Sequence, residues 1–248
     1  MFRSVVSKLN TMGYQCRPDV VFEGKVLSTR FGKATAQELK IACNKLLKLK
    51  TGANSVFFPN LKDLGKCVLI GHGDAGIKSM PDKITSVGGQ VVMLVNMDTD
   101  EAVTLGWKAK KIRRVVTSSL AGEALAMADT LAEVVYTKKV LEFIFGTRIN
   151  RIPTVITTDA KDLHDALHST SLVENPETII DVALIKQAMD QGKVNLIKLV
   201  RGSEMIANCL TKQGAGAAMM MKVLQEGKYR LPDGWEEVKT NRSPWCKN

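Results

Sequence analysis

The chain after residue 66 alternates short apolar runs with longer stretches of helical periodicity. Apolar runs bounded by glycine or aspartate turns predict strands, and apolar residues spaced three and four positions apart predict helices. The predicted strands are 66–70, 90–96, about 102–107, 154–158 and 194–200, and the predicted helices are about 119–144, 160–168, about 178–191 and a short one from about 203. This order of three strands, a helix, a strand, two helices, a strand and a helix is typical of an α/β fold.

A separate helix is predicted near the start of the chain. Thr35 and Glu38 have the spacing of a capping box, and apolar residues then recur at helical spacing up to Gly52, a typical C-terminal stop. These signals predict a helix over 36–51. Its other face carries Lys40, Lys45, Lys48 and Lys50. A row of lysines on a helix is either a solvated face or a surface for phosphates.

Turn-forming residues divide the chain into three parts. The stretch 59–63 has the composition of a linker, and the end over 227–248 contains Pro232, Gly234 and Pro244. This end predicts a loosely packed tail. We expect an N-terminal segment over 1–58, a main domain over 64–214 and a C-terminal tail over 215–248.

Net charge adds a partner class to this picture. The 248 residues include 35 basic and 25 acidic side chains, a net charge of +10, and the first 66 residues hold 12 of the basic and 4 of the acidic ones. Such an excess favours an anionic partner such as nucleic acid. The five cysteines are widely spaced, which favours neither a disulfide framework nor a zinc site. No apolar run approaches the roughly 18 residues of a membrane-spanning helix, so no membrane partner is expected.

Gly71, Gly73 and Gly76 form a G-x-G-x-x-G pattern directly after the first predicted strand, and a second strand ends at Asp98. On paper this pattern is typical of a dinucleotide-binding oxidoreductase. That function needs a helix to begin within the motif, so that its N-terminus can hold a pyrophosphate. Pro81 interrupts the segment that follows, which makes this alternative the weaker one.

Three acidic residues occupy positions that favour a metal site. Glu123 lies on the apolar stripe of the helix predicted over 119–144, or serves only the helix dipole. Asp159 follows the strand over 154–158, at an edge where α/β sheets place sites, or caps the next helix. Asp74 belongs to the first strand or to a turn. Carboxylates from three such elements are what two divalent cations about 3.5–4 Å apart require.

Five separated motifs occur around these acids. They are Asp74-Ala75, Trp107-Lys108-Ala109-Lys110-Lys111, Ser118-Ser119-Leu120-Ala121-Gly122-Glu123, Thr158-Asp159-Ala160-Lys161-Asp162-Leu163 and Ala207-Asn208-Cys209-Leu210-Thr211-Lys212. In this order they resemble the ribonuclease H domain at the end of the Pol polyprotein of copia-like retrotransposons. Phe2-Arg3-Ser4, Arg17-Pro18-Asp19-Val20 and Leu27-Ser28 resemble the segment just upstream in such polyproteins.

The resemblance implies an α/β, ribonuclease H-like fold, with a mixed five-stranded sheet flanked by helices and a small, mainly helical N-terminal segment that ends the reverse transcriptase. It implies hydrolysis of the RNA strand of RNA/DNA hybrids by two Mg²⁺ or Mn²⁺ ions, and the polymerase part of the polyprotein as a partner. The implied catalytic and metal-binding residues are Asp74, Glu123, Asp159 and Asn208. Candidate phosphate contacts are Lys108, Lys110, Lys111, Arg113 and Arg114.

Asn208 departs from the family pattern, which has an aspartate there. An amide oxygen still coordinates a hard cation, but the missing negative charge lowers affinity for one ion. Asp181 and Glu204 lie near enough in the sequence to be candidates for compensation. The alternative is a decayed retrotransposon fragment that binds nucleic acid without cleaving it.

Overall fold

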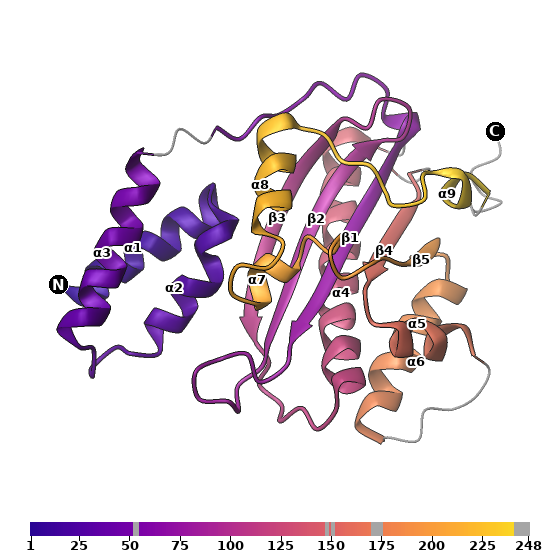
Figure 1. Ribbon diagram of the computed structural model, residues 1–248. Coiled ribbons are helices and arrows are strands. Elements are labelled where there is room, and N and C mark those ends of the chain that lie inside the picture. The colour runs from indigo at the N-terminus through magenta and orange to yellow at the C-terminus, as the bar shows by residue number, and fades with distance from the viewer. Residues whose placement is uncertain (52–54, 147–148, 150–151, 170–175, 241–248) are drawn as a thin grey trace.

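The computed structural model describes residues 1–51, 55–146, 149, 152–169 and 176–240. Its centre is a five-stranded sheet in the order β3-β2-β1-β4-β5 (Figure 1). The strands are β1 (Cys67–Gly76), β2 (Val87–Asn96), β3 (Ala102–Lys111), β4 (Thr154–Thr158) and β5 (Leu196–Leu199). β1, β2 and β3 are antiparallel, and β1, β4 and β5 are parallel. The predicted mixed five-stranded sheet is confirmed.

Helices cover both faces of this sheet. They are α1 (Phe2–Gln15), α2 (Val21–Ser28), α3 (Ala36–Thr51), α4 (Ser119–Phe145), α5 (Lys161–His168), α6 (Pro176–Asp190), α7 (Asn208–Thr211), α8 (Ala217–Glu226) and α9 (Glu236–Thr240). The helices predicted over 36–51, 119–144, 160–168 and 178–191 are confirmed to within two residues. The short helix predicted from 203 begins at Asn208, because residues 202–207 form turns.

Strand β1 is longer than its sequence indicates, since it continues from residue 70 to Gly76 through the glycine-rich motif. Residues 77–86 form turns, and the element that follows is strand β2. The helix that would hold a pyrophosphate is therefore not there. The dinucleotide-binding alternative is wrong.

The glycines of β1 allow α4 to lie close against the sheet. A Cβ atom at Gly71 would lie 2.5 Å from Cγ2 of Val134, and one at Gly73 would lie 2.6 Å from Oγ1 of Thr130. Such approaches are shorter than real Cβ contacts, so a side chain at either position would force α4 or its side chains to shift. The helix itself begins after Ser118, whose side chain accepts a hydrogen bond from the backbone N–H of Ala121.

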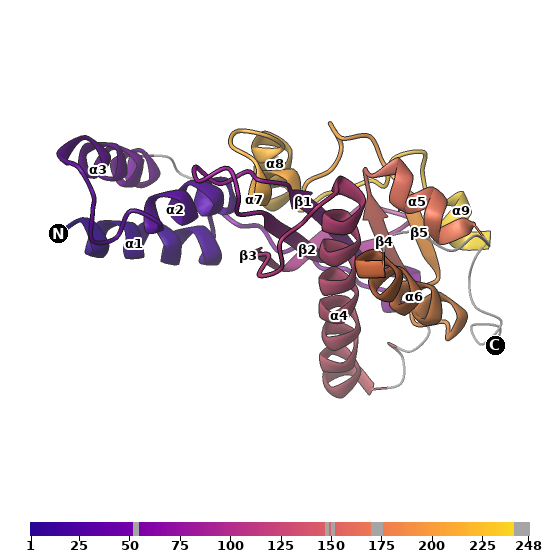
Figure 2. The same ribbon diagram turned by 90° about the horizontal axis from the view of Figure 1, so that it is seen from below.

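Residues alternate along β1 between two hydrophobic clusters. Cys67 and Leu69 pack with α4, whereas Val68 and Ile70 pack into the largest cluster on the opposite face. Figure 2 shows α4 on one side of the sheet and α7 and α8 on the other. A further cluster joins α4 to α5 and α6 beside β4 and β5.

The C-terminal region is part of the largest cluster. Tyr229, Leu231, Trp235 and Val238 are all buried in it, and the indole N–H of Trp235 donates to Oδ1 of Asp100 at 2.8 Å. The predicted loosely packed tail is therefore wrong as far as residue 240. Proline and glycine break any local periodicity there, so only tertiary contacts show the burial. Residues 241–248, with Pro244, lie outside the described residues.

The N-terminal helices pack on the edge of the sheet at β3. The indole N–H of Trp107 donates to the carbonyl oxygen of Gly13 at 2.9 Å, and Phe22 from α2 is buried in the largest cluster. The capping box of α3 is present, because Thr35 Oγ1 accepts from the N–H of Glu38 while a Glu38 oxygen accepts from the N–H of Thr35. Gly52, its predicted stop, lies outside the described residues. Among the helices that the structure describes, none is long and apolar enough to cross a membrane.

Candidate metal centre

Asp74 lies near the end of β1 with its side chain fully buried. Thr211 Oγ1 donates a hydrogen bond to one carboxylate oxygen, and the Lys212 ammonium lies 3.1 Å from the other. Both contacts come from the segment at the end of α7. Asp74 is thus held in one orientation by residues far away in the sequence.

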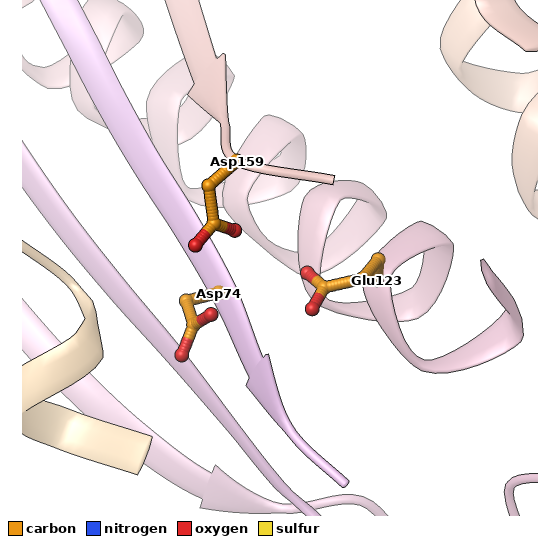
Figure 3. A group of neighbouring side chains, drawn as sticks. All are labelled: Asp74, Glu123 and Asp159. Carbon is orange, nitrogen blue, oxygen red and sulfur yellow. The ribbon is translucent and has the colours of Figure 1, made fainter. Parts of the chain in front are cut away.

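Two further acids reach this carboxylate from other elements. Glu123 comes from the second turn of α4, and Asp159 follows β4 directly. Oxygen atoms of Asp74, Glu123 and Asp159 lie within 4.8 Å of one another, and Figure 3 shows the three carboxylates turned toward a common space. Asp159 does not cap α5, because the N-cap residue is Ala160 and no side chain caps that end. Its role as a simple helix cap is excluded.

Burial and mutual repulsion perturb these acids. Burial, followed by the charges of Asp74 and Asp159, raises the pKa of Glu123 to about 8. The pKa of Asp159 is also raised, first by burial and then by Asp74. The positive charge of Lys212 opposes both shifts. Since close carboxylates in a buried site disfavour their charged forms, this arrangement favours a cation.

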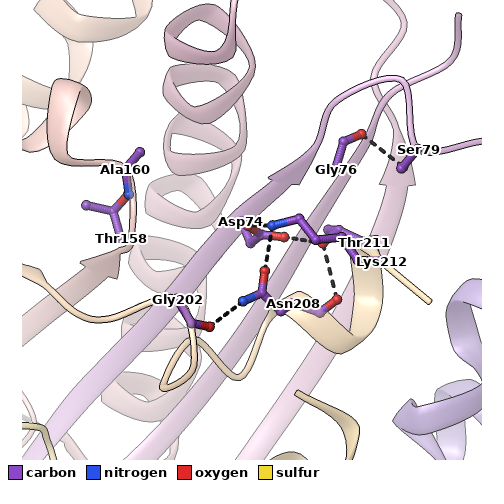
Figure 4. A network of polar contacts seen from close by, with 9 residues as sticks. All are labelled: Asp74, Gly76, Ser79, Thr158, Ala160, Gly202, Asn208, Thr211 and Lys212. Carbon is purple, nitrogen blue, oxygen red and sulfur yellow. Dashed lines mark hydrogen bonds and ion pairs between the residues drawn. The ribbon is translucent and has the colours of Figure 1, made fainter. Parts of the chain in front are cut away.

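Asn208 joins the cluster from α7. Its amide Nδ2 donates to the carbonyl oxygen of Gly202 at 2.7 Å, which directs Oδ1 to the Lys212 ammonium at 2.8 Å (Figure 4). A hydrogen bond from the Asn208 side chain also lowers the pKa of Asp159. The four predicted ligands therefore meet at one edge of the sheet.

Thr211 and Lys212 are the site residues that sequence reasoning missed. Both belong to the closing motif from Ala207 to Lys212, so the signal was present, but the pattern alone gave them no role. The reason is geometric. Only the packing of α7 against β1 and β2 brings their side chains to Asp74.

The five predicted basic residues lie near α4, and most of them line one cavity. Three of them make ion pairs within the protein, namely Lys108 with Glu133 at 2.6 Å, Lys110 with Asp129 at 3.9 Å and Arg114 with Asp181 at 3.1 Å. All except Lys108 line a cavity of about 330 Å³ beside the first half of α4, together with Asp129. The cavity gathers positive charge on the α4 side of the sheet. Asp181 is engaged by Arg114, and Glu204 accepts from the backbone N–H of Arg201 at 3.3 Å.

The donor set fits a hard divalent cation. Carboxylate and amide oxygens are the ligands that Mg²⁺ and Mn²⁺ prefer, and a cation among these oxygens would offset the burial and the neighbouring charges that raise the pKa of Glu123. No cysteine or histidine belongs to this group among the described residues. The fold and this site together define an α/β protein with a cluster of three carboxylates, a candidate metal centre, at the carboxyl ends of β1 and β4.

Comparison with known proteins gives one curated relative. The chain is 25% identical over 239 residues to the retrovirus-related Pol polyprotein from transposon RE1 of Arabidopsis thaliana, a match that covers 93% of this chain and 15% of that protein. The predicted resemblance to a retrotransposon Pol polyprotein is confirmed. No protein-family model matches the chain.

Solved structures show more distant likeness. LC11-RNase H1 isolated from compost is 16% identical, with a TM-score of 0.43 over 61% of this chain and 98% of that one. The same enzyme in complex with an RNA/DNA hybrid is 15% identical, with a TM-score of 0.42 over 62% and 99%. The prototype foamy virus protease–reverse transcriptase is 15% identical, with a TM-score of 0.38 over 82% of this chain and 29% of that one.

Proposed function

We propose that this chain hydrolyses the RNA strand of RNA/DNA hybrids internally, as part of a longer retrotransposon Pol polyprotein. The observation that carries the proposal is the meeting of Asp74, Glu123 and Asp159, three acids from separate motifs, within 4.8 Å. The curated relative supports the polyprotein context. Residues 1–58 are then the end of the polymerase part, which is the proposed protein partner.

Two Mg²⁺ or Mn²⁺ ions are part of this proposal. Asp74, Glu123 and Asp159 supply the charged ligands, and the amide oxygen of Asn208 supplies a neutral one. Bound divalent ions activate water and stabilise the negative charge on the leaving 3′ oxygen. Thr211 fixes the orientation of Asp74, since its hydroxyl donates to that carboxylate. The Asp74 side chain is fully buried, so bulk water does not reach its carboxylate.

The hybrid is proposed to lie along the basic residues. Lys110, Lys111, Arg113 and Arg114 line the cavity beside α4, and Lys108 lies on the same strand as Lys110. Phosphate contacts position a nucleic acid without reading its sequence, and 2′-hydroxyl contacts distinguish RNA from DNA. The ion pairs of Lys108, Lys110 and Arg114 exchange for phosphates on binding.

A second candidate is a protein that binds hybrid without cleaving it. Asn208 removes one negative charge from the ligand set, and the Lys212 ammonium occupies its oxygen. Both features weaken the hold on cations. This candidate has the same fold and ligand as the first, so only chemistry at the metal centre separates them.

Cleavage of a labelled RNA/DNA hybrid by the purified chain, with Mg²⁺ or Mn²⁺, tests the proposal. We expect cleavage of the RNA strand that falls to background in Asp74→Asn, because a buried metal ligand is lost. We expect Asn208→Asp to cleave faster than the starting protein. Asp190→Asn, the same change at the exposed end of α6, is the matched control and keeps full activity.

The outcomes separate the two candidates. Cleavage by Asn208→Asp alone means that the fold is inactivated by one missing charge and favours the non-cleaving binder. Equal cleavage by Asp74→Asn and the starting protein contradicts the proposed metal centre. Hybrid binding without cleavage in every variant establishes the second candidate.

A further inference from the structure

The metal centre already contains a cation of the protein itself. The Lys212 ammonium lies 3.1 Å from an oxygen of Asp74 and 2.8 Å from Oδ1 of Asn208 (Figure 4). It therefore bridges a charged and a neutral member of the predicted ligand set. Lysine is a compact point charge, and a position between two oxygen ligands is one that a metal ion would otherwise take.

A second cation at Asp74 competes with Lys212 for one carboxylate oxygen. One of its oxygens accepts from Thr211 and the other is paired with Lys212. Asp74 is fully buried, whereas the Lys212 side chain is 44% exposed. The carboxylate is therefore fixed while the ammonium can be withdrawn toward solvent. Lys212 contacts Asp74 directly and acts on Glu123 and Asp159 through its charge.

Charge balance favours one divalent ion, rather than two, beside Lys212. Asp74, Glu123 and Asp159 carry three negative charges when ionised, and Asn208 carries none. Lys212 reduces the net charge of the group to −2, which one divalent ion neutralises. Two divalent ions beside Lys212 would leave a net charge of +2 in a partly buried site, where unbalanced charge is strongly unfavourable. An aspartate at position 208 would offset half of that excess.

We propose that the Lys212 ammonium occupies the position of the second cation, so that the chain binds one divalent ion readily and a second one only by displacing Lys212. This inference rests on the metal centre of the proposed function and specifies how that centre fills. Lys212 is then a positioning residue. It holds Asp74 and Asn208 in place before a cation binds, and it sets the order in which the two cations bind.

Counting bound Mn²⁺ in the full chain, without nucleic acid, tests the inference. The signal of free Mn²⁺ in electron paramagnetic resonance gives the number and affinity of bound ions. We expect the starting protein to bind one ion per chain readily. In Lys212→Gln we expect a second ion to bind as well, with a dissociation constant about tenfold or more below that of a second ion in the starting protein. Lys212→Arg keeps the charge and is expected to bind one ion.

Lys222→Gln is the matched control, because it removes the same charge from the exposed side of α8. An equal gain in second-ion affinity in Lys222→Gln overturns the inference, since net charge alone then explains it. Two ions of similar affinity in the starting protein also overturn it. If Lys212→Gln binds Mn²⁺ with the same number of ions and the same affinity as the starting protein, this inference alone is contradicted. If no variant binds Mn²⁺, the metal centre itself is contradicted.

Discussion

The two faces of the sheet are covered in different ways. On one face the long helix α4 crosses β1 at a close approach that Gly71 and Gly73 allow, and α5 and α6 join it beside β4 and β5. On the other face the cover comes from both ends of the chain, with Phe22 from α2 and Trp235 beyond α8 in the same cluster as Val68.

The two faces thus differ in whether nearby or distant parts of the chain cover them. The α4 face is covered by helices that follow one another within the main domain, and the fit of α4 depends on the absence of side chains at Gly71 and Gly73 in β1. The opposite face depends on residues that are more than 200 positions apart in the sequence. The metal centre lies where the faces meet, because Asp74 points to the α7 side, Glu123 comes from α4 and Asp159 follows β4.

The largest expected effect comes from Trp235, which helps to cover the face opposite α4. Trp235→Ala deletes a buried indole and its hydrogen bond to Asp100, so we expect the free energy of unfolding to fall by about 4 kcal/mol. Urea denaturation measures the change. Phe58→Ala, which truncates an aromatic side chain that is 64% exposed, is the control with an expected change below about 0.5 kcal/mol. Equal changes in the two variants would mean that the C-terminal region is not part of the core.

The next effect adds an atom to the α4 face. Gly71→Ala places a methyl group against Val134 and Thr130, both stiff at χ1, and we expect a loss of about 3 kcal/mol. Gly106→Ala on β3 meets nothing within 4 Å and is the control. Thermal unfolding of Gly71→Ala combined with Val134→Ala is expected to show partial recovery. A double variant that loses the sum of both single effects would argue against the close contact.

His72, on the face opposite α4, makes the free energy of unfolding depend on pH. Burial lowers the pKa of His72 to about 3, so the folded protein keeps it neutral while the unfolded chain takes up a proton below about pH 6.5. Stability is therefore fully present above pH 6.5 and falls with pH, by about 2 kcal/mol at pH 5. Denaturation of His72→Gln across this range is expected to show a smaller loss. An unchanged slope would place the cause elsewhere.

Glu123 gives the α4 side the opposite dependence. Its pKa of about 8 exceeds that of the unfolded chain, so the folded state binds the proton more tightly. Its contribution is present below about pH 4.5 and is lost as pH rises toward 8. Without divalent ions, we expect Glu123→Gln to be more stable than the starting protein at pH 8 by about 1.4 kcal/mol or more, the equivalent of one pKa unit. Denaturation with a chelator at pH 5 and pH 8 measures this, and equal differences at both values would contradict it.

The smallest effect concerns nucleic acid. Arg113 lines the basic cavity on the α4 side, so Arg113→Gln is expected to weaken hybrid binding modestly and to reduce the slope of log affinity against log salt by about 1. Lys222→Gln on α8, on the opposite face, is expected to leave the slope unchanged. Titrations of a fluorescent hybrid at several salt concentrations measure both. Similar slopes for the two variants would mean that neither face is preferred.

Particular elements show how far sequence reasoning reached. The strand over 154–158 and the helices over 36–51 and 119–144 carry their own signals, since apolar spacing and caps are local. The end of β1 did not, because glycines weaken a strand unless a neighbour needs the space. The burial of Leu231 and Trp235 also had no local signal, because turn residues surround them.

The sequence by itself determined the order of elements and the acids that they carry, because periodicity, caps and motif spacing are properties of neighbouring residues. It also determined that residue 208 has no negative charge. Only the tertiary structure decided that Asp74, Glu123 and Asp159 meet and that Lys212 lies beside Asp74 and Asn208. These contacts join residues up to 138 positions apart, and their distances depend on how strands pair and helices pack. No local pattern specifies those distances, so the cation at the centre of the site became visible only in the folded chain.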